Sequence, residues 1–533
     1  MRYLILFAFG ATFFLSCKTA KNSFATPGDA VASTTAGPVR GFSTAGIYIF
    51  KGIPYAQAER FMPPRPLTSW KEVRSTVSYG PACPQNTPKV INESEFFFHH
   101  DFGFPSENCL SLNIWTPGIQ DHRKRPVMVW LHGGGFATGS GNELPSYDGE
   151  NLSRKGDVVV VNLNHRLNVL GFLDLSVFGE KYKSSGNIGM LDIVAALQWV
   201  KENIRSFGGD PDNITIFGQS GGGRKVTALL SMPGAKGLFH KAIIQSGAGL
   251  SFYNKDESQR IGKLVAARLG LTESTIDSIQ RIPYERLREA GEEALKQLNE
   301  EYRRQARTLD GFNVRWSPVI DNDIIPYQPG DLRSNEFSKG IPIIIGSNKH
   351  EFIAAFDKTG PFQQPSEQEA MAQLAIRYPG MAEAYATAVK QAYPDTKRPL
   401  DLLEIDSRTR AASLQLAAIK SAASTVYNYL FTWESPVLDG RFRSAHCLEL
   451  PFVFNNVEKC REMTGLTKEA FQLGDRMSQS WINFARTGNP QYNKLPDWKA
   501  YLPANGNTLL FNATPKLVQH HDRKLLELAA TKN

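Results

Sequence analysis

Residues 214–223 read ITIFGQSGGG, and this stretch decides the fold class that the sequence predicts. Its first four residues are continuously apolar and β-rich, which is typical of a short strand buried on both faces. The Gly-x-Ser-x-Gly pattern of residues 218–222 follows, and then a helix-compatible stretch. This is the context of a nucleophile elbow, in which small neighbours are needed because the serine occupies a strained turn. We therefore predict that Ser220 is a catalytic nucleophile.

The rest of the chain repeats the strand pattern. Further short, continuously apolar runs occupy residues 126–131, 157–162, 242–245, 342–345 and 427–432. Helical patterns lie between them, most clearly over residues 189–204. This alternation predicts an α/β fold with a mostly parallel central sheet flanked by helices. Two long charged helical regions, residues 257–307 and 366–423, are predicted to be cap insertions over the sheet.

Size and charge narrow the function classes. The 533 residues are 41% hydrophobic and 21% charged, which indicates a globular protein with a large core. The net charge is +8, but the charges are interspersed. The densest basic cluster, residues 123–125, is expected to be a solvated loop before a strand. We therefore exclude nucleic acid as a partner.

The amino terminus has the layout of an export signal. Residues 3–15 are an apolar run that is too short to span a bilayer, and Ser16 and Cys17 follow it. We predict a signal peptide over residues 1–17, a polar linker over 18–36 and one catalytic domain over 37–533. Residues 14–17 also resemble a lipoprotein cleavage box, in which Cys17 becomes a lipidated membrane tether; an ordinary signal peptide is the alternative. Either way the protein is predicted to be exported: periplasmic, secreted or lipid-anchored in a bacterial envelope.

Cysteine usage fits an oxidising compartment. Beyond Cys17, the chain has Cys83, Cys109, Cys447 and Cys460, an even number. Two disulfides are possible, and the sequence alone permits three pairings. The local pairing closes the shortest loops.

A second glycine-rich motif precedes the serine motif. Residues 132–136 read HGGGF and directly follow the apolar run 126–131. Three consecutive glycines allow the backbone N–H groups to face a cavity, which suits an oxyanion hole. We predict that Gly134, Gly135 and Gly221 supply its donors.

Several motifs in one order carry a family resemblance. They are SENCLSLN (106–113), HGGGF (132–136), GNIG (186–189), FGGDP (207–211) and FGQSGGG (217–223). From about residue 38 to 498 the chain resembles the type-B carboxylesterase family, which includes cholinesterases and bacterial para-nitrobenzyl-type esterases. The resemblance implies an α/β-hydrolase fold that hydrolyses small carboxylic esters by acyl transfer through a serine. It implies no cofactor.

The resemblance also supplies the remaining site residues. Glu351, at the end of SNKHE (347–351), and His446, in SAHCLELPF (444–452), match the family's catalytic acid and histidine. The chain order Ser220, Glu351, His446 is the order expected of this fold. Cys83 and Cys109 match the family's first disulfide, whereas Cys447 and Cys460 are either bridged or free.

Two departures from the family bear on the substrate. Gln219 stands where the family commonly has Glu, and residues 84–108 contain five phenylalanines but no Trp. Cholinesterase-like members hold a quaternary ammonium group against a Trp in this loop, a cation–π contact worth about 2 kcal/mol. We therefore predict that Gln219, Phe136 and the loop phenylalanines favour neutral, short to medium acyl esters over choline esters.

Two alternatives share these residues. An amidase or peptidase would use the same triad, because acyl transfer by serine does not itself distinguish an ester from an amide. A non-catalytic binding ectodomain is disfavoured because all three triad residues are present. The histidines show no metal-ligand spacing.

Overall fold

The computed structural model describes residues 30–86, 93–305, 314–357 and 364–531, so the predicted signal peptide and Cys17 lie outside the described residues. Its centre is an 11-stranded sheet in the order β16-β15-β14-β13-β10-β9-β7-β8-β6-β4-β3. Seven neighbouring strands are mutually parallel: β8 (Val159–Leu163), β7 (Arg125–Leu131), β9 (Gly209–Gln219), β10 (Lys241–Gln245), β13 (Ile343–Asn348), β14 (Val426–Phe431) and β15 (Asn507–Phe511). The predicted mostly parallel sheet is therefore confirmed.

Antiparallel strands extend both edges of this sheet. They are β16 (Lys516–Gln519) at one edge and β6 (Ser111–Thr116), β4 (Ile47–Pro54) and β3 (Phe42–Thr44) at the other. Two small sheets join β1 (Val31–Ser33), β2 (Pro38–Arg40) and β5 (Arg74–Ser75), and β11 (Tyr253–Asn254) with β12 (Val319–Ile320). Because Val31–Ser33 form a strand, the predicted linker of residues 18–36 does not extend to its predicted end.

The central strands are buried on both faces, which explains their continuously apolar sequences. In β7, Val127 and Val129 belong to one hydrophobic cluster and Met128 and Trp130 to another. One face is covered by α4 (Ile188–Asn203), α5 (Gly221–Leu229) and α11 (Ser407–Ser421), and the other by α2 (Glu150–Gly156) and α15 (Lys468–Thr487).

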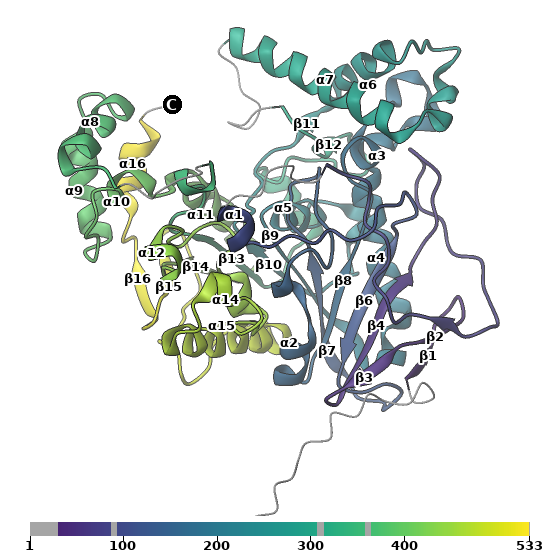
Figure 1. Ribbon diagram of the computed structural model, residues 1–533, viewed down its shortest axis with the longest axis horizontal. Coiled ribbons are helices and arrows are strands. Elements are labelled where there is room, and N and C mark those ends of the chain that lie inside the picture. The colour runs from purple at the N-terminus through teal and green to yellow at the C-terminus, as the bar shows by residue number, and fades with distance from the viewer. Residues whose placement is uncertain (1–29, 87–92, 306–313, 358–363, 532–533) are drawn as a thin grey trace, which may run out of the picture.

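The predicted cap regions separate into two groups of helices. In Figure 1, α6 (Lys255–Arg268) and α7 (Tyr284–Arg304) lie together at the top, and α8 (Glu367–Arg377) and α9 (Ala382–Ala392) lie beside α16 (Arg523–Ala530) at the left. The prediction was wrong for the end of the second region, because α11 packs on β13 and β14 as a helix of the sheet layer. The remaining helices are short: α1 (Glu93–Phe97), α3 (Asn168–Phe172), α10 (Asp401–Glu404), α12 (Val437–Gly440), α13 (Leu450–Val453) and α14 (Arg461–Thr464). Among the described residues, no helix combines the length and apolarity needed to cross a membrane.

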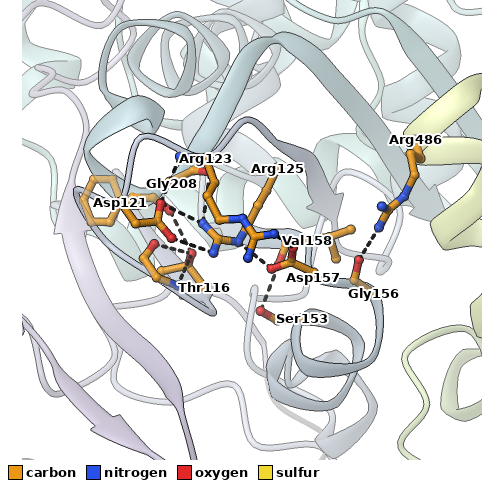
Figure 2. Close-up of polar contacts among 12 residues, drawn as sticks. Thr116, Asp121, Arg123, Arg125, Ser153, Gly156, Asp157, Val158, Gly208 and Arg486 are labelled. Atoms are coloured by element: carbon orange, nitrogen blue, oxygen red, sulfur yellow. Dashed lines mark hydrogen bonds and ion pairs between the residues drawn. The ribbon is translucent and has the colours of Figure 1, made fainter.

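A buried arginine fixes the amino ends of the parallel strands. Figure 2 shows the Arg125 guanidinium between Asp121 and Asp157, with Nη2–Oδ2 and Nε–Oδ1 distances of 2.6 Å. The Arg125 side chain is only 4% exposed, whereas that of Arg123 is 65% exposed. The basic cluster of residues 123–125 is therefore partly structural and not simply a solvated loop.

Candidate active site

Ser220 occupies a strained turn between β9 and α5. Its backbone has φ 56° and ψ −122°, a region that residues other than glycine rarely adopt. The surrounding glycines are sterically required: a Cβ at Gly222 would lie 1.9 Å from the Leu131 carbonyl oxygen, and one at Gly218 would lie 2.5 Å from the Gly222 carbonyl carbon. The close approach of α5 to β7 thus explains why the sequence has small residues on both sides of the serine.

The HGGGF loop lies against this turn. Gly134 and Gly135 have φ values of 76° and 64°, which glycine adopts without strain. A Cβ at Gly221 would lie 2.4 Å from the Gly135 amide nitrogen, so these two backbones are in direct contact. The structure therefore brings two of the predicted oxyanion-hole glycines, Gly135 and Gly221, to the serine.

His446 and Glu351 meet at the carboxyl end of β13. Nδ1 of His446 lies 2.6 Å from Oε2 of Glu351, and the His446 backbone N–H donates to the Glu351 carbonyl oxygen at 2.9 Å. Glu351 is fully buried. Its other carboxylate oxygen accepts from the Asn348 backbone N–H at 2.8 Å. The Asn348 N–H thus fixes the orientation of the carboxylate group that contacts the imidazole.

Gln219 connects the histidine to the serine turn. Its Nε2 lies 3.3 Å from Nε2 of His446, and its Oε1 accepts from Sγ of Cys447 at 3.2 Å. Among the described residues, no hydrogen bond joins the Ser220 hydroxyl to His446. Contacts of this kind are often long in structures without substrate and tighten in the complex.

The pKa of His446 is raised above its usual 6.5. Burial alone would lower this pKa, but the hydrogen bond and the charge of Glu351 outweigh burial, and Glu449 and Asp406 add to them. The raised pKa makes the imidazole a stronger base, as a group that must accept a serine proton requires.

A second buried carboxyl group, Glu449, was missed in the sequence. Asn348 Nδ2 and Gln245 Nε2 donate to it at 2.9 and 3.1 Å. Burial, reinforced by the charge of Glu351, raises the pKa of Glu449 to about 7. Its position three residues after His446 was visible, but nothing in the local pattern showed that it faces Asn348.

A cavity of about 790 Å³ opens onto Ser220, Gly221 and Gly135. Phe352 also lines it, with its ring centroid 4.4 Å from that of His446, and its side chain is 61% exposed. The charged side chains among its described lining residues are Arg224, Arg315 and Arg408. Neither Phe352 nor these arginines belong to a motif that could be recognised in the sequence.

The predicted role of Phe136 is corrected. It is 2% exposed, and its ring packs on those of Phe172 and Phe252 with centroid distances of 5.1 and 6.1 Å. The turn of the HGGGF loop directs this ring into the core, away from the cavity lining.

The phenylalanines of the loop are also placed elsewhere. Phe97 and Phe98 pack on Phe442, and Phe96 and Phe104 are exposed. No phenylalanine of the loop's described part lines the cavity at Ser220, so the predicted apolar wall is not built from them. Residues 87–92 of the loop lie outside the described residues.

The predicted disulfides are absent among the described cysteines. Cys83, Cys109, Cys447 and Cys460 are free thiols. Cys83 and Cys109 are both buried and their thiols contact each other, which raises the pKa of Cys109. Cys447 contacts Gln219 instead of Cys460, which agrees with the free-thiol alternative for Cys447 and Cys460.

His350, the histidine next to Glu351, belongs to a separate cluster. His350, Asp401 and Glu434 place possible ligand atoms within 4.8 Å of one another. The Arg443 guanidinium already donates to Asp401, and its Nη1 lies 3.5 Å from Nε2 of His350. An arginine in this position leaves the three residues poorly suited to a metal ion.

Comparisons with known proteins agree with the geometry. The profile of the Carboxylesterase family matches residues 28–527. The chain is 35% identical to the para-nitrobenzyl esterase of Bacillus subtilis (strain 168), over 91% of this chain and 95% of that protein. It is 33% identical to the phenmedipham hydrolase of Pseudarthrobacter oxydans, over 88% of this chain and 92% of that protein.

Solved structures give the same result. An esterase from the anaerobe Clostridium hathewayi, described as hydrolysing aliphatic aromatic polyesters, matches with a TM-score of 0.86 at 37% identity, over 96% of this chain and 100% of that one. A structure of PNB esterase matches with a TM-score of 0.74 at 33% identity, over 93% and 99%. With the mostly parallel sheet, these neighbours define the fold as that of the α/β-hydrolase esterases. The chain belongs to the carboxylesterase family and is a carboxylesterase that acts on small-molecule esters.

Proposed function

We propose that this carboxylesterase hydrolyses neutral, short to medium acyl esters through a Ser220, His446 and Glu351 triad and an acyl-enzyme intermediate. The observation that carries the proposal is the 2.6 Å contact between His446 Nδ1 and Glu351 Oε2, beside the strained Ser220 turn. A carboxylate on Nδ1 leaves Nε2 as the basic nitrogen, which is the tautomer that can accept the serine proton.

The chemistry proceeds in two acyl transfers. Ser220 Oγ attacks the ester carbonyl carbon as His446 Nε2 takes its proton, and collapse of the tetrahedral intermediate releases the alcohol, which receives that proton. Water then attacks the acyl-serine ester, again losing a proton to His446. The carboxylic acid leaves, and the proton returns to Ser220 Oγ.

Backbone N–H groups of Gly134, Gly135 and Gly221 are the proposed donors to the tetrahedral oxyanion. The direct contact between Gly135 and Gly221 supports this assignment, because both glycines also line the cavity at Ser220. Each such donor is worth about 3 kcal/mol of transition-state stabilisation.

The preference for uncharged esters rests on the charges near the serine. Gln219 brings no carboxylate to the imidazole, and the charged side chains in the described cavity lining are arginines. Residues 84–108 offer no Trp that could hold a quaternary ammonium group by a cation–π contact.

The test is a hydrolysis panel with wild-type protein and the Ser220→Ala variant. It contains para-nitrophenyl esters of increasing acyl length and the matching anilides. We expect hydrolysis of the esters from acetate to hexanoate. The matching anilides should be hydrolysed at least about 100-fold more slowly. Equal rates on esters and anilides would favour the amidase alternative.

Cellular location is a separate proposal. We propose that the protein is exported and that Cys17, if lipidated, tethers it to a membrane without touching the site. Cys17→Ser should then move the protein from the membrane fraction to the soluble fraction with unchanged specific activity. Identical fractionation of both forms would leave the ordinary signal peptide.

A further inference from the structure

A cluster of buried ionisable side chains lies beneath the HGGGF loop, outside the triad. It consists of Lys225 on α5, Glu143, His132 and His165, each 5% exposed or less. The two imidazole rings lie 5.2 Å apart, centroid to centroid. Buried lysine and glutamate side chains are rare unless they are paired, and the proposed acyl transfer uses none of these groups.

Lys225 contacts the start of the loop. Its Nζ donates to the His132 carbonyl oxygen at 2.9 Å, directly before Gly133. Lys225 lies four residues after Gly221, so it follows one helical turn later on the same face of α5. The first turn of α5 packs directly on the end of β7, and the Lys225 side chain reaches the carbonyl group one residue beyond that contact.

The glycine-rich loop continues from HGGGF to Ser140, and Glu143 contacts this far end. Its Oε2 accepts from the Ser140 backbone N–H at 3.2 Å, and its Oε1 accepts from the Tyr147 hydroxyl at 3.1 Å. Between these two ends, Gln85 binds both polar backbone groups of Gly139, at 2.6 and 3.0 Å. The loop is therefore held at its start, near its end and at Gly139.

We propose that Lys225 is a positioning residue for acyl transfer: by holding the His132 carbonyl group, with Glu143 as its counter-charge, it fixes the loop whose glycines bind the oxyanion. This inference rests on the proposed function. Lys225 acts through the backbone and does not touch the substrate, since the described cavity lining does not include it.

Among the described residues Lys225 and Glu143 form no direct ion pair, but each lies close enough to act on the charge of the other. Burial lowers the pKa of Lys225 to about 7, and Glu143 opposes this shift. Burial likewise raises the pKa of Glu143 to about 7, and Lys225 and the Tyr147 hydroxyl oppose that shift. Burial, with the charge of Lys225, lowers the pKa of His132 and His165 well below 6.5, so both imidazoles stay neutral near pH 7.

The test compares two buried lysines. Lys225→Met removes the donor at similar volume. Lys420→Met is the matched control, because Lys420 is 1% exposed on α11 and contacts Ser334 and Ser338 instead of the loop. We expect Lys225→Met to lower kcat about 10- to 100-fold with KM within about twofold, as for a displaced oxyanion donor. Lys420→Met should retain wild-type kcat.

The specific readout is the affinity for a trifluoromethyl ketone inhibitor, which forms a tetrahedral adduct with a nucleophilic serine. Its affinity should fall in Lys225→Met by the same factor as kcat, and a general loss of stability would not produce this match. Unchanged kcat and ketone affinity, or a rise in KM alone, would overturn the proposal.

Glu143→Gln keeps the test decisive if Lys225→Met does not fold. It removes the counter-charge but retains an acceptor for Ser140, so we expect parallel falls of about three- to tenfold in kcat and ketone affinity. No change in either quantity counts against the proposal. Ser220→Ala tests the triad independently of Lys225. Turnover that survives in Ser220→Ala would contradict the proposed triad, whereas the Lys225 and Glu143 variants test only the positioning of the loop.

Discussion

The two ends of the parallel sheet carry different kinds of buried charge. At the amino ends of β7 and β8, Arg125 lies between two aspartates. At the carboxyl ends of the strands, the buried ionisable groups lie around His446 and the HGGGF loop. The amino-end cluster is compensated, because each aspartate approaches the guanidinium within hydrogen-bonding distance. At the carboxyl end, burial shifts the pKa values of Glu449, Glu143 and Lys225 to about 7, and the charge of Glu351 adds to the shift of Glu449.

The difference indicates two uses of buried charge in one sheet. Paired charges with ordinary protonation states stabilise the fold, whereas strained or shifted groups are typical of sites that carry out chemistry. Substitutions at the two ends should therefore have different effects. Those at the amino end should lower stability, and those at the carboxyl end should lower activity.

The largest effect is expected for Ser220→Ala. Removing the nucleophile should lower kcat for para-nitrophenyl butyrate by about three orders of magnitude or more. The melting temperature should stay the same or rise slightly, because alanine removes no packing. Turnover close to that of the wild type would contradict the proposed mechanism.

Much of this fold could be predicted from the sequence, for identifiable reasons. The central strands are buried on both faces, so apolar runs marked six of the seven parallel strands, although β9 begins five residues before its predicted run and β15 was missed. The Ser220 turn was visible because steric contacts at Gly218 and Gly222 restrict those positions to glycine.

Other site residues could not be read from local pattern. Glu351 and His446 lie 95 residues apart and meet only through the topology of β13 and the loop after β14, so the family resemblance was needed to assign them. Phe136 was assigned wrongly because a sequence does not show which way a loop side chain turns. Lys225 was missed because a lysine in a helix is ordinarily solvated.

The next largest effect is expected for Glu351→Gln. Without the carboxylate, the His446 tautomer is no longer fixed, and kcat should fall about 1,000-fold. Because Glu351 raises the pKa of His446, that pKa should fall in the variant. Catalysis needs the neutral imidazole, so the acid limb of the pH profile of kcat/KM should move to lower pH.

Glu434→Gln is the matched control for this prediction. Glu434 pairs with Lys349 at 3.3 Å and makes no contact with His446 among the described residues. Its variant should keep the wild-type pH profile. An acid limb that stays in place in Glu351→Gln would show that another group sets the pKa of the base.

A stability effect is expected at the amino end of the sheet. Arg125→Met leaves Asp121 and Asp157 without their shared guanidinium, and we expect a loss of about 2 kcal/mol in the free energy of unfolding. This expected loss in the free energy of unfolding is smaller than for a fully buried ion pair, because the aspartate side chains are 31% and 44% exposed. Denaturant titration measures it, and kcat of the folded variant should match the wild type.

Arg123→Met provides the comparison for Arg125→Met. Arg123 also faces Asp157, but at 3.8 Å and with a 65% exposed side chain, so its removal should cost about 0.5 kcal/mol or less. Equal losses in the two variants would mean that the amino-end charges act through long-range attraction and not through the buried contacts of Arg125.

The smallest effect is expected for Gln219→Glu, which adds a carboxylate to the reactive end of the sheet. Gln219 Nε2 lies 3.3 Å from Nε2 of His446, so the new charge would stabilise the imidazolium and move the acid limb of kcat/KM to higher pH. The same charge would attract a cationic alcohol group. Wild-type protein should prefer para-nitrophenyl butyrate over butyrylthiocholine by at least about tenfold in kcat/KM at low salt, because it lacks a cation–π contact worth about 2 kcal/mol. In Gln219→Glu this ratio should narrow by about two- to fivefold, and added salt should change it little, because Gln219 is fully buried and a buried charge is only weakly screened. A wild-type preference for the choline ester would contradict both the assignment of the loop and the role given to Gln219.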